Sequence, residues 1–238
     1  MGLSYQDALA YYGVGGAHPG GLSLTKQILK FEKINPSTKI LDAGCGTGQT
    51  AAYLEETYKC DVTVLDSHPI MLEKAKQRFK YAHLPIKVLR GSVEDLPFAD
   101  DSFDLIISES VIAFTNINKT LSEYFRVLKK EGILINIDMT AEIPLTHSDS
   151  LLFSEVYGIS KLNTEEEWLS ALHSAGFRKV DILSTDTIFS HLQKNIDQPE
   201  FNLSDSIDPQ LMDIMLKHQD ITTKFSKKIG YRVFRSTR

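Results

Sequence analysis

The chain has 238 residues, of which 42% are hydrophobic and 24% are charged, and its formal net charge is −5 at pH 7. This length and composition predict one globular domain that buries a sizeable core. The negative charge argues against a general nucleic-acid binder, because binding to phosphates requires surplus Lys and Arg.

Signals of export, membrane insertion and metal binding are missing from the sequence. No apolar run approaches the roughly 18 residues that span a bilayer, and the N-terminus lacks a basic segment followed by an apolar one. Cys45 and Cys60 are too few for a disulfide framework and lack the spacing of metal ligands. We therefore expect a cytoplasmic protein with no membrane contact and no bound metal.

The first distinctive segment is YYGVGGAHPGG, residues 11–21, which holds five glycines. A phosphate-binding turn requires a strand before it and a helix that opens from it. The preceding MGLSYQDALA has no strand pattern, so the segment does not meet that requirement. It needs another explanation.

From Lys39 onward, short runs rich in β-branched residues alternate with segments of helical periodicity. Strands are predicted at residues 39–43, 62–66, 86–90, 103–108, 132–139, 179–185 and 230–236. Helices are predicted at residues 49–59 and 118–130, from Pro69 onward, from a Thr164/Glu167 capping box to Gly176, and from Asp208-Pro209 onward. This alternation predicts an α/β fold, with an open, doubly wound parallel sheet covered by helices on both faces.

Two segments, residues 141–160 and 186–228, do not follow this alternation. Each leaves from the sheet and can cover part of its rim, so we expect helical cap insertions there. The predicted helix of the second segment carries Leu211, Met215 and His218 on one face. Methionine-lined faces adapt to apolar ligands, although core packing explains the same face.

The segment LDAGCGTGQT, residues 41–50, meets the requirement that residues 11–21 fail. A predicted strand leads into three closely spaced glycines, and a predicted helix begins directly after them. Glycines permit a sharp turn and a close approach of backbone to ligand. A dinucleotide fingerprint would need its third glycine at Gln49, which disfavours the alternative of a dinucleotide-dependent oxidoreductase.

Polar residues follow the next two predicted strands. Asp66 ends the second strand, where a carboxylate can accept hydrogen bonds from both hydroxyls of a ribose; it could instead cap the helix that begins at Pro69. Ser92, Val93 and Glu94 follow the third strand, where a backbone N–H and a side-chain acceptor could contact an adenine edge. A solvated loop is the alternative for Glu94.

Together, LDAGCGTG, the acidic residue that ends the second strand and GSVEDLPFADDSFD resemble the class I S-adenosylmethionine-dependent methyltransferases. The likeness is greatest to the small-molecule branch that includes the ubiquinone/menaquinone-type enzymes, and EEEWLSALHSAGFRKVDIL resembles the helix and strand that end many of its members. The resemblance implies a Rossmann-like, seven-stranded, mostly parallel sheet. Its last strand would be antiparallel and would lie between the fifth and sixth. Residues 1–238 would form one domain, with residues 39–140 as the cofactor-binding core.

The resemblance also implies S-adenosyl-L-methionine as the cofactor and assigns residues to it. Gly44, Cys45 and Gly46 would lie under its methionine part, Asp42 would support that turn or meet the amino group, and Asp66 would hold the ribose. The full set that it assigns to the cofactor is Asp42, Gly44, Cys45, Gly46, Asp66, Ser67, His68, Ser92, Val93, Glu94, Ser108 and Glu109. Relatives of the ubiquinone type commonly carry Asp where this chain has Ser92, so the adenine contact departs from their pattern.

In such a fold, the chain before the first strand can lie over the crevice, so residues 1–38 are predicted as an N-terminal lid region with the glycines of residues 11–21 as hinges. A loose terminal loop is the alternative. The candidate residues of the substrate pocket are Tyr11, Tyr12, His18, Phe153, Tyr157 and Met215. A general base is needed only if the methyl-accepting atom must lose a proton, and the candidates are His18, Glu109, Asp138 and His147.

The sequence therefore predicts a methyltransferase that acts on a small, partly apolar metabolite by in-line methyl transfer. Two alternatives stay open: a non-catalytic module that binds S-adenosylmethionine, and an RNA methyltransferase that uses the basic segment at residues 224–238. That segment, KFSKKIGYRVFRSTR, carries six basic residues and no acidic one. The preferred explanation of this segment is an exposed final strand that its Lys and Arg residues protect against edge pairing.

Overall fold

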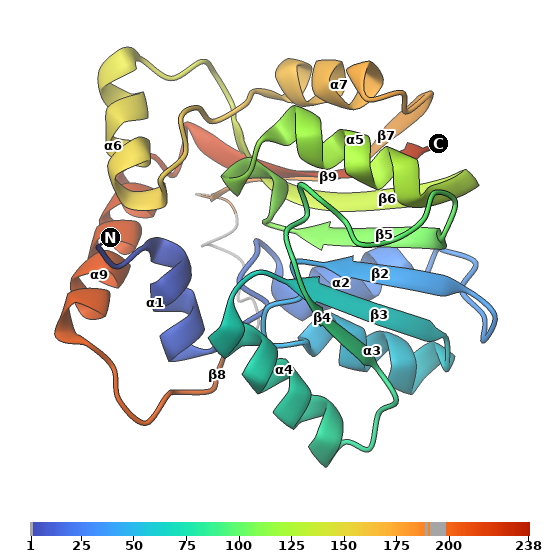
Figure 1. Cartoon of the computed structure of the whole chain (residues 1–238). Helices are drawn as coiled ribbons and strands as arrows, with labels where there is room; N and C mark the ends of the chain where they lie inside the picture. The colour runs from blue at the N-terminus through green and yellow to red at the C-terminus, as the bar shows by residue number, and fades with distance from the viewer. Residues whose placement is uncertain (1, 189, 191–198) are drawn as a thin grey trace.

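The computed structural model describes residues 2–188, 190 and 199–238. These residues form a seven-stranded sheet with the order β4-β3-β2-β5-β6-β9-β7 (Figure 1). The strands are β2 (Lys39–Ala43), β3 (Asp61–Asp66), β4 (Lys87–Arg90), β5 (Phe103–Glu109), β6 (Leu128–Ala141), β7 (Lys179–Thr187) and β9 (Ile229–Thr237). β9 runs antiparallel to both of its neighbours, whereas the other paired strands are parallel. The predicted fold, with its antiparallel last strand, is confirmed.

β9 is an inner strand, and the interpretation of this segment as an exposed edge strand is wrong. It pairs with β6 on one side and with β7 on the other. Arg232 is 6% exposed and forms ion pairs with Glu142 and Glu165, while Arg235 pairs with Glu32. These basic side chains therefore balance carboxylates within the molecule, since a buried charge must be paired.

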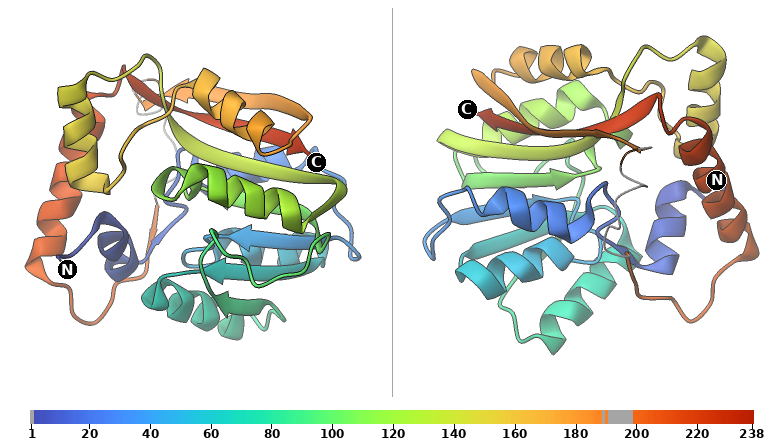
Figure 2. Two further views of the ribbon diagram at one scale, coloured as in Figure 1. Left: turned by 45° about the horizontal axis from the view of Figure 1, so that its top comes forward. Right: turned by 180° about the vertical axis from the view of Figure 1, so that it is seen from behind.

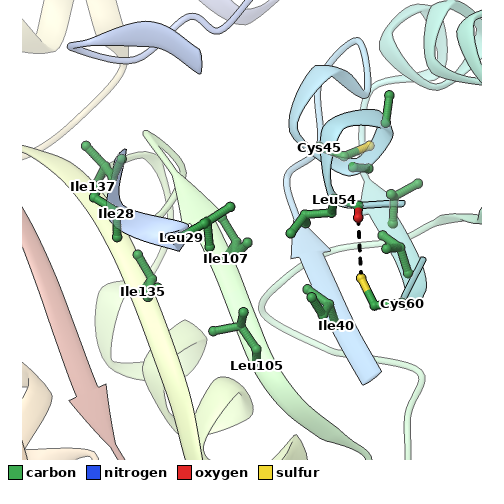
Figure 3. Packing of buried hydrophobic residues seen from close by; sticks show 14 of the residues in the cluster. Ile28, Leu29, Ile40, Cys45, Leu54, Cys60, Leu105, Ile107, Ile135 and Ile137 are labelled. Carbon is green, nitrogen blue, oxygen red and sulfur yellow. Dashed lines mark hydrogen bonds between the residues drawn. The ribbon is translucent and has the colours of Figure 1, made fainter. Parts of the chain in front are cut away.

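The side chains of the strands alternate between two layers of helices. On one face, α2 (Gly21–Leu29), α3 (Gln49–Tyr58) and α4 (Pro69–Tyr81) pack against a cluster that includes Ile40 and Ile107 (Figure 3). On the other face, α5 (Ile117–Val127) and α7 (Glu165–Ser174) pack against Leu41 and Ile106. Neighbouring residues of one strand thus face opposite layers, which explains why the strands are almost continuously apolar.

A third group of helices lies beyond the carboxyl ends of the parallel strands. α1 (Tyr5–Tyr12), α6 (His147–Tyr157) and α9 (Pro209–Lys224) gather there, to the left of the arrowheads of β2 and β5 in Figure 1 and together again in Figure 2. They share an apolar cluster that includes Tyr5, Phe153, Tyr157, Ile221 and Phe225. In an open α/β sheet, ligands bind at this edge.

Short strands join distant parts of the chain at the same edge. β1 (Val14–Gly15) pairs antiparallel with β8 (Glu200–Phe201), so part of the glycine-rich segment is ordered by the second cap segment. Part of that predicted segment, residues 189 and 191–198, lies outside the described residues. The glycine-rich segment is therefore not simply a loose loop.

Side-chain caps mark the starts of several helices, and some of these caps were predicted from the sequence. Thr164 and Glu167 form the predicted capping box, and the side chain of Asp208 accepts from the backbone N–H of Gln210 at the start of α9. Ser4 and Asp7 form a second capping box that begins α1. The spacing of Ser4 and Asp7 in MGLSYQDALA is the sequence signal of this helix start.

Candidate active site

The turn of residues 44–48 joins β2 to α3 at the carboxyl edge of the sheet. Gly44 has a φ of +82°, and a Cβ there would lie 2.3 Å from Cγ2 of Val111. Gly46 has a φ of +52°, but a Cβ there would meet no atom within 4 Å. Gly44 therefore lets the turn pack against Val111, whereas Gly46 faces open space and leaves it free for a ligand.

Asp66 at the end of β3 fixes this turn. One carboxylate oxygen accepts a hydrogen bond from the N–H of Gly46 (2.9 Å), and the other accepts from the N–H of His68 (2.8 Å). Burial raises the pKa of Asp66, and these N–H groups act in the opposite direction. The helix cap before α4 is His68, without a side-chain hydrogen bond. Asp66 thus supports the turn of residues 44–48 rather than capping α4.

Asp42 in β2 is a buried carboxylate with an unused acceptor. It is 2% exposed, and its Oδ2 has no hydrogen-bond partner in the described part of the chain. Burial, followed by the charges of Glu109 and Asp66, raises the pKa of Asp42 well above its usual value. A positive group beside these three carboxylates would offset their repulsion, so the electrostatics of this edge favour a cationic ligand.

Glu109, the last residue of β5, is held by hydroxyl groups from two helices. Thr50 of α3 donates to Oε2 (2.7 Å), and Thr25 of α2 donates to Oε1. The side chain of Glu109 is 9% exposed. Neither threonine is near Glu109 in the chain, so sequence position alone does not connect them with it.

His18 approaches the same carboxylate from the glycine-rich segment. Its Nε2 lies 3.5 Å from Oε1 of Glu109 and 3.4 Å from the hydroxyl of Thr25, and its Nδ1 lies 3.2 Å from the carbonyl oxygen of Pro19. Both ring nitrogens therefore face protein atoms. As a general base, His18 would first have to leave these neighbours, so the geometry favours a role in fixing the glycine-rich segment to β5.

Asp42, Asp66, Glu109 and His18 line a cavity of about 340 Å³, called the smaller cavity below. Most residues predicted to bind the cofactor lie in its lining, namely Asp42, Gly44, Cys45, Gly46, Asp66, Ser67, His68, Ser92, Val93 and Glu109. The lining also contains residues that were not predicted, among them Thr47, Gln49, Thr50, Met71, Ser110, Val111 and Phe114. Thr47 and Gln49 adjoin the glycines and could have been found by position alone.

Glu94 and Ser108 are absent from this lining as described, so their assignment to the cofactor stays a prediction. Glu94 accepts a hydrogen bond from the N–H of Asn116 (2.9 Å), at the start of α5. Ser108 is fully buried, and its hydroxyl lies 3.1 Å from that of Tyr124 in α5. Neighbouring side chains of a strand point to opposite faces. Glu109 faces the cavity, so Ser108, the residue before it, faces α5.

His68 connects the smaller cavity to the N-terminal helix. Its Nε2 lies 3.2 Å from Oδ1 of Asp7 in α1, and its Nδ1 is buried without a partner in the described structure. Burial acts to raise the pKa of Asp7, but hydrogen bonds from Ser4, followed by the contact with His68, lower it overall. α1 is therefore joined by a polar contact to the residue that follows Asp66 and Ser67.

A larger cavity of about 680 Å³ adjoins the smaller one, and the two share Tyr5, His18, Ser110 and Phe114 in their linings. Phe114 belongs to the short helix η1 (Ile112–Phe114) that follows β5. The larger cavity is mostly apolar, with Leu9, Val14, Phe114, Met139, Ile188, Phe201, Met215 and Ile229 in its lining. Its polar lining residues include Lys26, Gln49, Glu200, His218 and Thr222.

Of the predicted pocket residues, His18 and Met215 line this cavity, whereas four aromatic residues do not belong to its lining as described: Tyr11, Tyr12, Phe153 and Tyr157. The hydroxyl of Tyr12 points instead to the sulfur of Met212, near the surface (3.5 Å). Phe153 and Tyr157 pack inside the cluster of α1, α6 and α9. Phe153 and Tyr157 therefore pack behind the residues that line the larger cavity, not among them.

Two candidate bases also lie away from the described linings of both cavities. His147 is exposed at the first position of α6. Asp138 is buried in β6, where it accepts hydrogen bonds from the N–H of Ala113 (3.2 Å) and from the amide of Asn136 (3.0 Å). Burial raises the pKa of Asp138 to about 7. Its contacts point to a structural role beneath η1.

Comparisons with known proteins agree with this geometry. A family model described as a methyltransferase domain matches residues 41–136. The uncharacterized methyltransferase YodH of Bacillus subtilis (strain 168) is 39% identical over 97% of this chain and 97% of its own length. The chloroplastic 2-methyl-6-phytyl-1,4-hydroquinone methyltransferase of Arabidopsis thaliana is 32% identical over 62% of this chain and 42% of its own length.

Solved structures share the fold. Phosphoethanolamine N-methyltransferase 2 of Haemonchus contortus, in complex with S-adenosyl-L-methionine, matches with a TM-score of 0.76 and 16% identity, over 99% of this chain and 57% of that one. At this identity the likeness shows the arrangement of the elements alone.

Proposed function

The chain belongs to the S-adenosylmethionine-dependent methyltransferases, and from that premise we propose that it methylates a small, partly apolar metabolite held in the larger cavity. The observation that carries this proposal is the adjacency of two cavities of different character. One is lined by carboxylates and the glycine turn, and the other is mostly apolar. Shared lining residues such as Ser110 and Phe114 mark where the two ligands would meet.

The residues at the smaller cavity fit the charge and shape of the cofactor. The unpartnered oxygen of Asp42 suits the ammonium of its methionine part, and the open space at Gly46 leaves room for that part. Asp66 retains acceptor capacity for the ribose hydroxyls, since each carboxylate oxygen has two lone pairs. Ser92 and Val93 are proposed for the adenine, without Glu94.

S-Adenosylmethionine, when bound, supplies an electrophilic methyl group on a positively charged sulfur. The chain's own contribution is to orient the acceptor in line with that methyl group and to exclude water, which can lower a barrier by about 7–11 kcal/mol. The buried carboxylate of Glu109, fixed by Thr25 and Thr50, adds a negative charge that favours the cationic ligand.

The helices at the carboxyl edge are proposed as a cap over the substrate. α1 and α9 pack together, with the ring of Tyr5 stacked on that of His218, and β1 pairs with β8. α2, by contrast, packs Ile28 and Leu29 into the main core, so the proposed lid is limited to the part of residues 1–38 that precedes it. The proposed cap comprises residues 1–20, 141–160 and the described part of 186–228.

An RNA substrate has less support, because the basic segment is engaged within the molecule. Arg232 and Arg235 pair with glutamates, Lys228 pairs with Asp149, and Arg238 contacts Asp101. Few of these cations are left to neutralise phosphates.

A cytoplasmic location is proposed from the thiols. Cys45 and Cys60 are free and buried, as expected in a reducing compartment. Among the described helices, none combines the length and the apolar character needed to cross a bilayer.

The test combines calorimetry with turnover. S-Adenosylhomocysteine should bind and NAD should not, and labelled methyl groups should pass to small apolar acceptors but not to RNA. Met215→Trp should fill the larger cavity and lower turnover without changing the affinity for S-adenosylhomocysteine. Met212→Trp, on the same helix but 52% exposed, is the matched control. Equal turnover in the two variants would contradict the assignment of the larger cavity.

A further inference from the structure

His218 of α9 is a polar side chain in a mostly apolar part of the larger cavity. Its ring stacks on that of Tyr5, with centroids 5.0 Å apart and an angle of 26° between the planes. Tyr5 itself lines both cavities. His218 is thus attached to the part of the larger cavity that adjoins the smaller one.

One nitrogen of this ring is fixed by a buried phenol. The hydroxyl of Tyr157 lies 2.8 Å from Nδ1 of His218, and Tyr157 is 2% exposed. Burial raises the pKa of Tyr157, so the phenol keeps its proton. In the described structure this hydroxyl has no other acceptor, and a buried O–H that finds no acceptor is costly. Tyr157 therefore donates to Nδ1.

This donation decides which ring nitrogen carries the proton. Burial lowers the pKa of His218, which favours the neutral ring. A neutral imidazole whose Nδ1 accepts a hydrogen bond carries its proton on Nε2. Nε2 has no partner among the described residues. The ring therefore offers one donor, Nε2–H, that the protein itself does not use.

We propose that His218 is a specificity-determining residue, held by Tyr157 so that its Nε2–H donates to an oxygen atom of the substrate. This inference rests on the proposed function, because it takes the larger cavity as the substrate pocket. It narrows the substrate to apolar molecules that carry a hydroxyl or carbonyl oxygen. Hydrocarbons of the same shape leave the donor unpaired and are rejected.

The first test uses two probes of similar shape, 1-naphthol and 1-methylnaphthalene, added to the complex with S-adenosylhomocysteine. We expect 1-naphthol to bind about tenfold more tightly, which is the effect of one hydrogen bond whose donor would otherwise be buried unpaired. In His218→Phe, which keeps an aromatic ring against Tyr5, this preference should disappear. Equal binding of the probes to the wild type, or a preference that survives in His218→Phe, overturns the proposal.

The second test reads the ring directly by NMR of protein labelled with ¹⁵N-histidine. Nε2 should carry the proton and should shift with 1-naphthol but not with 1-methylnaphthalene. In Tyr157→Phe, which retains the ring packing, the proton should distribute over both nitrogens. The control is His83→Asn, which removes an exposed imidazole at a positive φ that Asn tolerates. It should leave the signals of His218 and the preference between probes unchanged.

The outcomes separate this inference from the proposed function. If Nδ1 carries the proton in the wild type, the role of His218 as donor is wrong even when the probes bind. If neither probe perturbs Met215 or Phe114, the larger cavity is not the substrate pocket. The proposed function then fails, and the inference that depends on it fails as well.

Discussion

The smaller and the larger cavity lie side by side but are built from different kinds of sequence. The smaller one is formed mainly by short segments that directly follow β2, β3, β4 and β5, and its lining contains the carboxylates of Asp42, Asp66 and Glu109. The larger one needs residues from α1, β8, α9 and the end of β6. Its character depends on side chains that meet only after the cap helices pack on the sheet.

From this difference we expect cofactor binding and substrate choice to be separable in this chain. The turn of residues 44–48 is fixed to Asp66 by a hydrogen bond from the N–H of Gly46 to the carboxylate of Asp66. The cap is attached by an apolar cluster, by the contact of Asp7 with His68 and by the two-residue ladder of β1 and β8. Changes in α6 and α9, which contribute no residue to the described lining of the smaller cavity, should therefore alter the substrate while leaving the cofactor site intact.

The largest effect is expected for Gly46→Val. The new side chain would occupy the open space beside the turn, and we expect the affinity for S-adenosylhomocysteine to fall by about 100-fold or more, roughly 2.7 kcal/mol. Gly158→Val is the matched control, since Gly158 also has a positive φ (+69°) and open space around a Cβ. Calorimetry should show that Gly158→Val binds S-adenosylhomocysteine with unchanged affinity. If Gly46→Val has the same affinity as this control, the glycine at position 46 serves the backbone conformation and not the cofactor.

Asp66→Ala tests the ribose contact. Removing the carboxylate should weaken S-adenosylhomocysteine binding by about 1.5–3 kcal/mol, the range for hydrogen bonds to a charged group. Asp104→Ala removes a carboxylate at the start of β5, at the opposite rim of the sheet, and should not change the affinity. An affinity within twofold of wild type in Asp66→Ala would exclude the ribose role.

Asp138 lies where the sheet meets η1, and it should make stability depend on pH. Its pKa is raised from 3.8 to about 7 by burial. In this interval the folded chain holds a proton that the unfolded chain has lost, so the free energy of unfolding falls as the pH rises. Between pH 5 and pH 8, the wild type should lose on the order of 2 kcal/mol of its free energy of unfolding through this group. Asp138→Asn should not show this loss.

Urea unfolding at the two pH values measures this difference. Asp149→Asn is the control, because the ion pair with Lys228 lowers the pKa of Asp149. Its contribution to stability is present above the usual pKa and is lost as the pH falls, so it has the opposite sign. If the free energy of unfolding of Asp138→Asn falls with pH as steeply as that of the wild type, another buried carboxylate causes the pH dependence.

The smallest effect concerns the cap. Filling the crevice with S-adenosylhomocysteine should slow hydrogen exchange modestly in α1, α6 and α9, because local opening becomes less frequent when the cap gains contacts. α5, which packs on the sheet away from both cavities, should change least. Identical exchange in α1, α6 and α9 with and without the ligand would mean that these helices are fixed walls.

The sequence alone determined the sheet and most of the smaller cavity. Strands such as residues 39–43 and 103–108 were recognisable because parallel strands buried on both faces are almost continuously apolar. The glycine turn and Asp66 were recognisable because they directly follow such strands, and parallel strands bring their carboxyl ends to one edge. The contacts of Thr25 and Thr50 with Glu109 could not be recognised in this way, because both threonines are far from Glu109 in the chain.

Only the tertiary structure decided which residues line the larger cavity. Phe153, Tyr157 and His218 all come from the predicted cap segments, yet the packing of α6 against α9 turns the first two into the core and leaves His218 at the cavity. It likewise placed the basic strand β9 inside the sheet, where Arg232 meets Glu142. Helical periodicity indicates which residues share a face of one helix, but the direction of that face is set by contacts with segments far away in the chain.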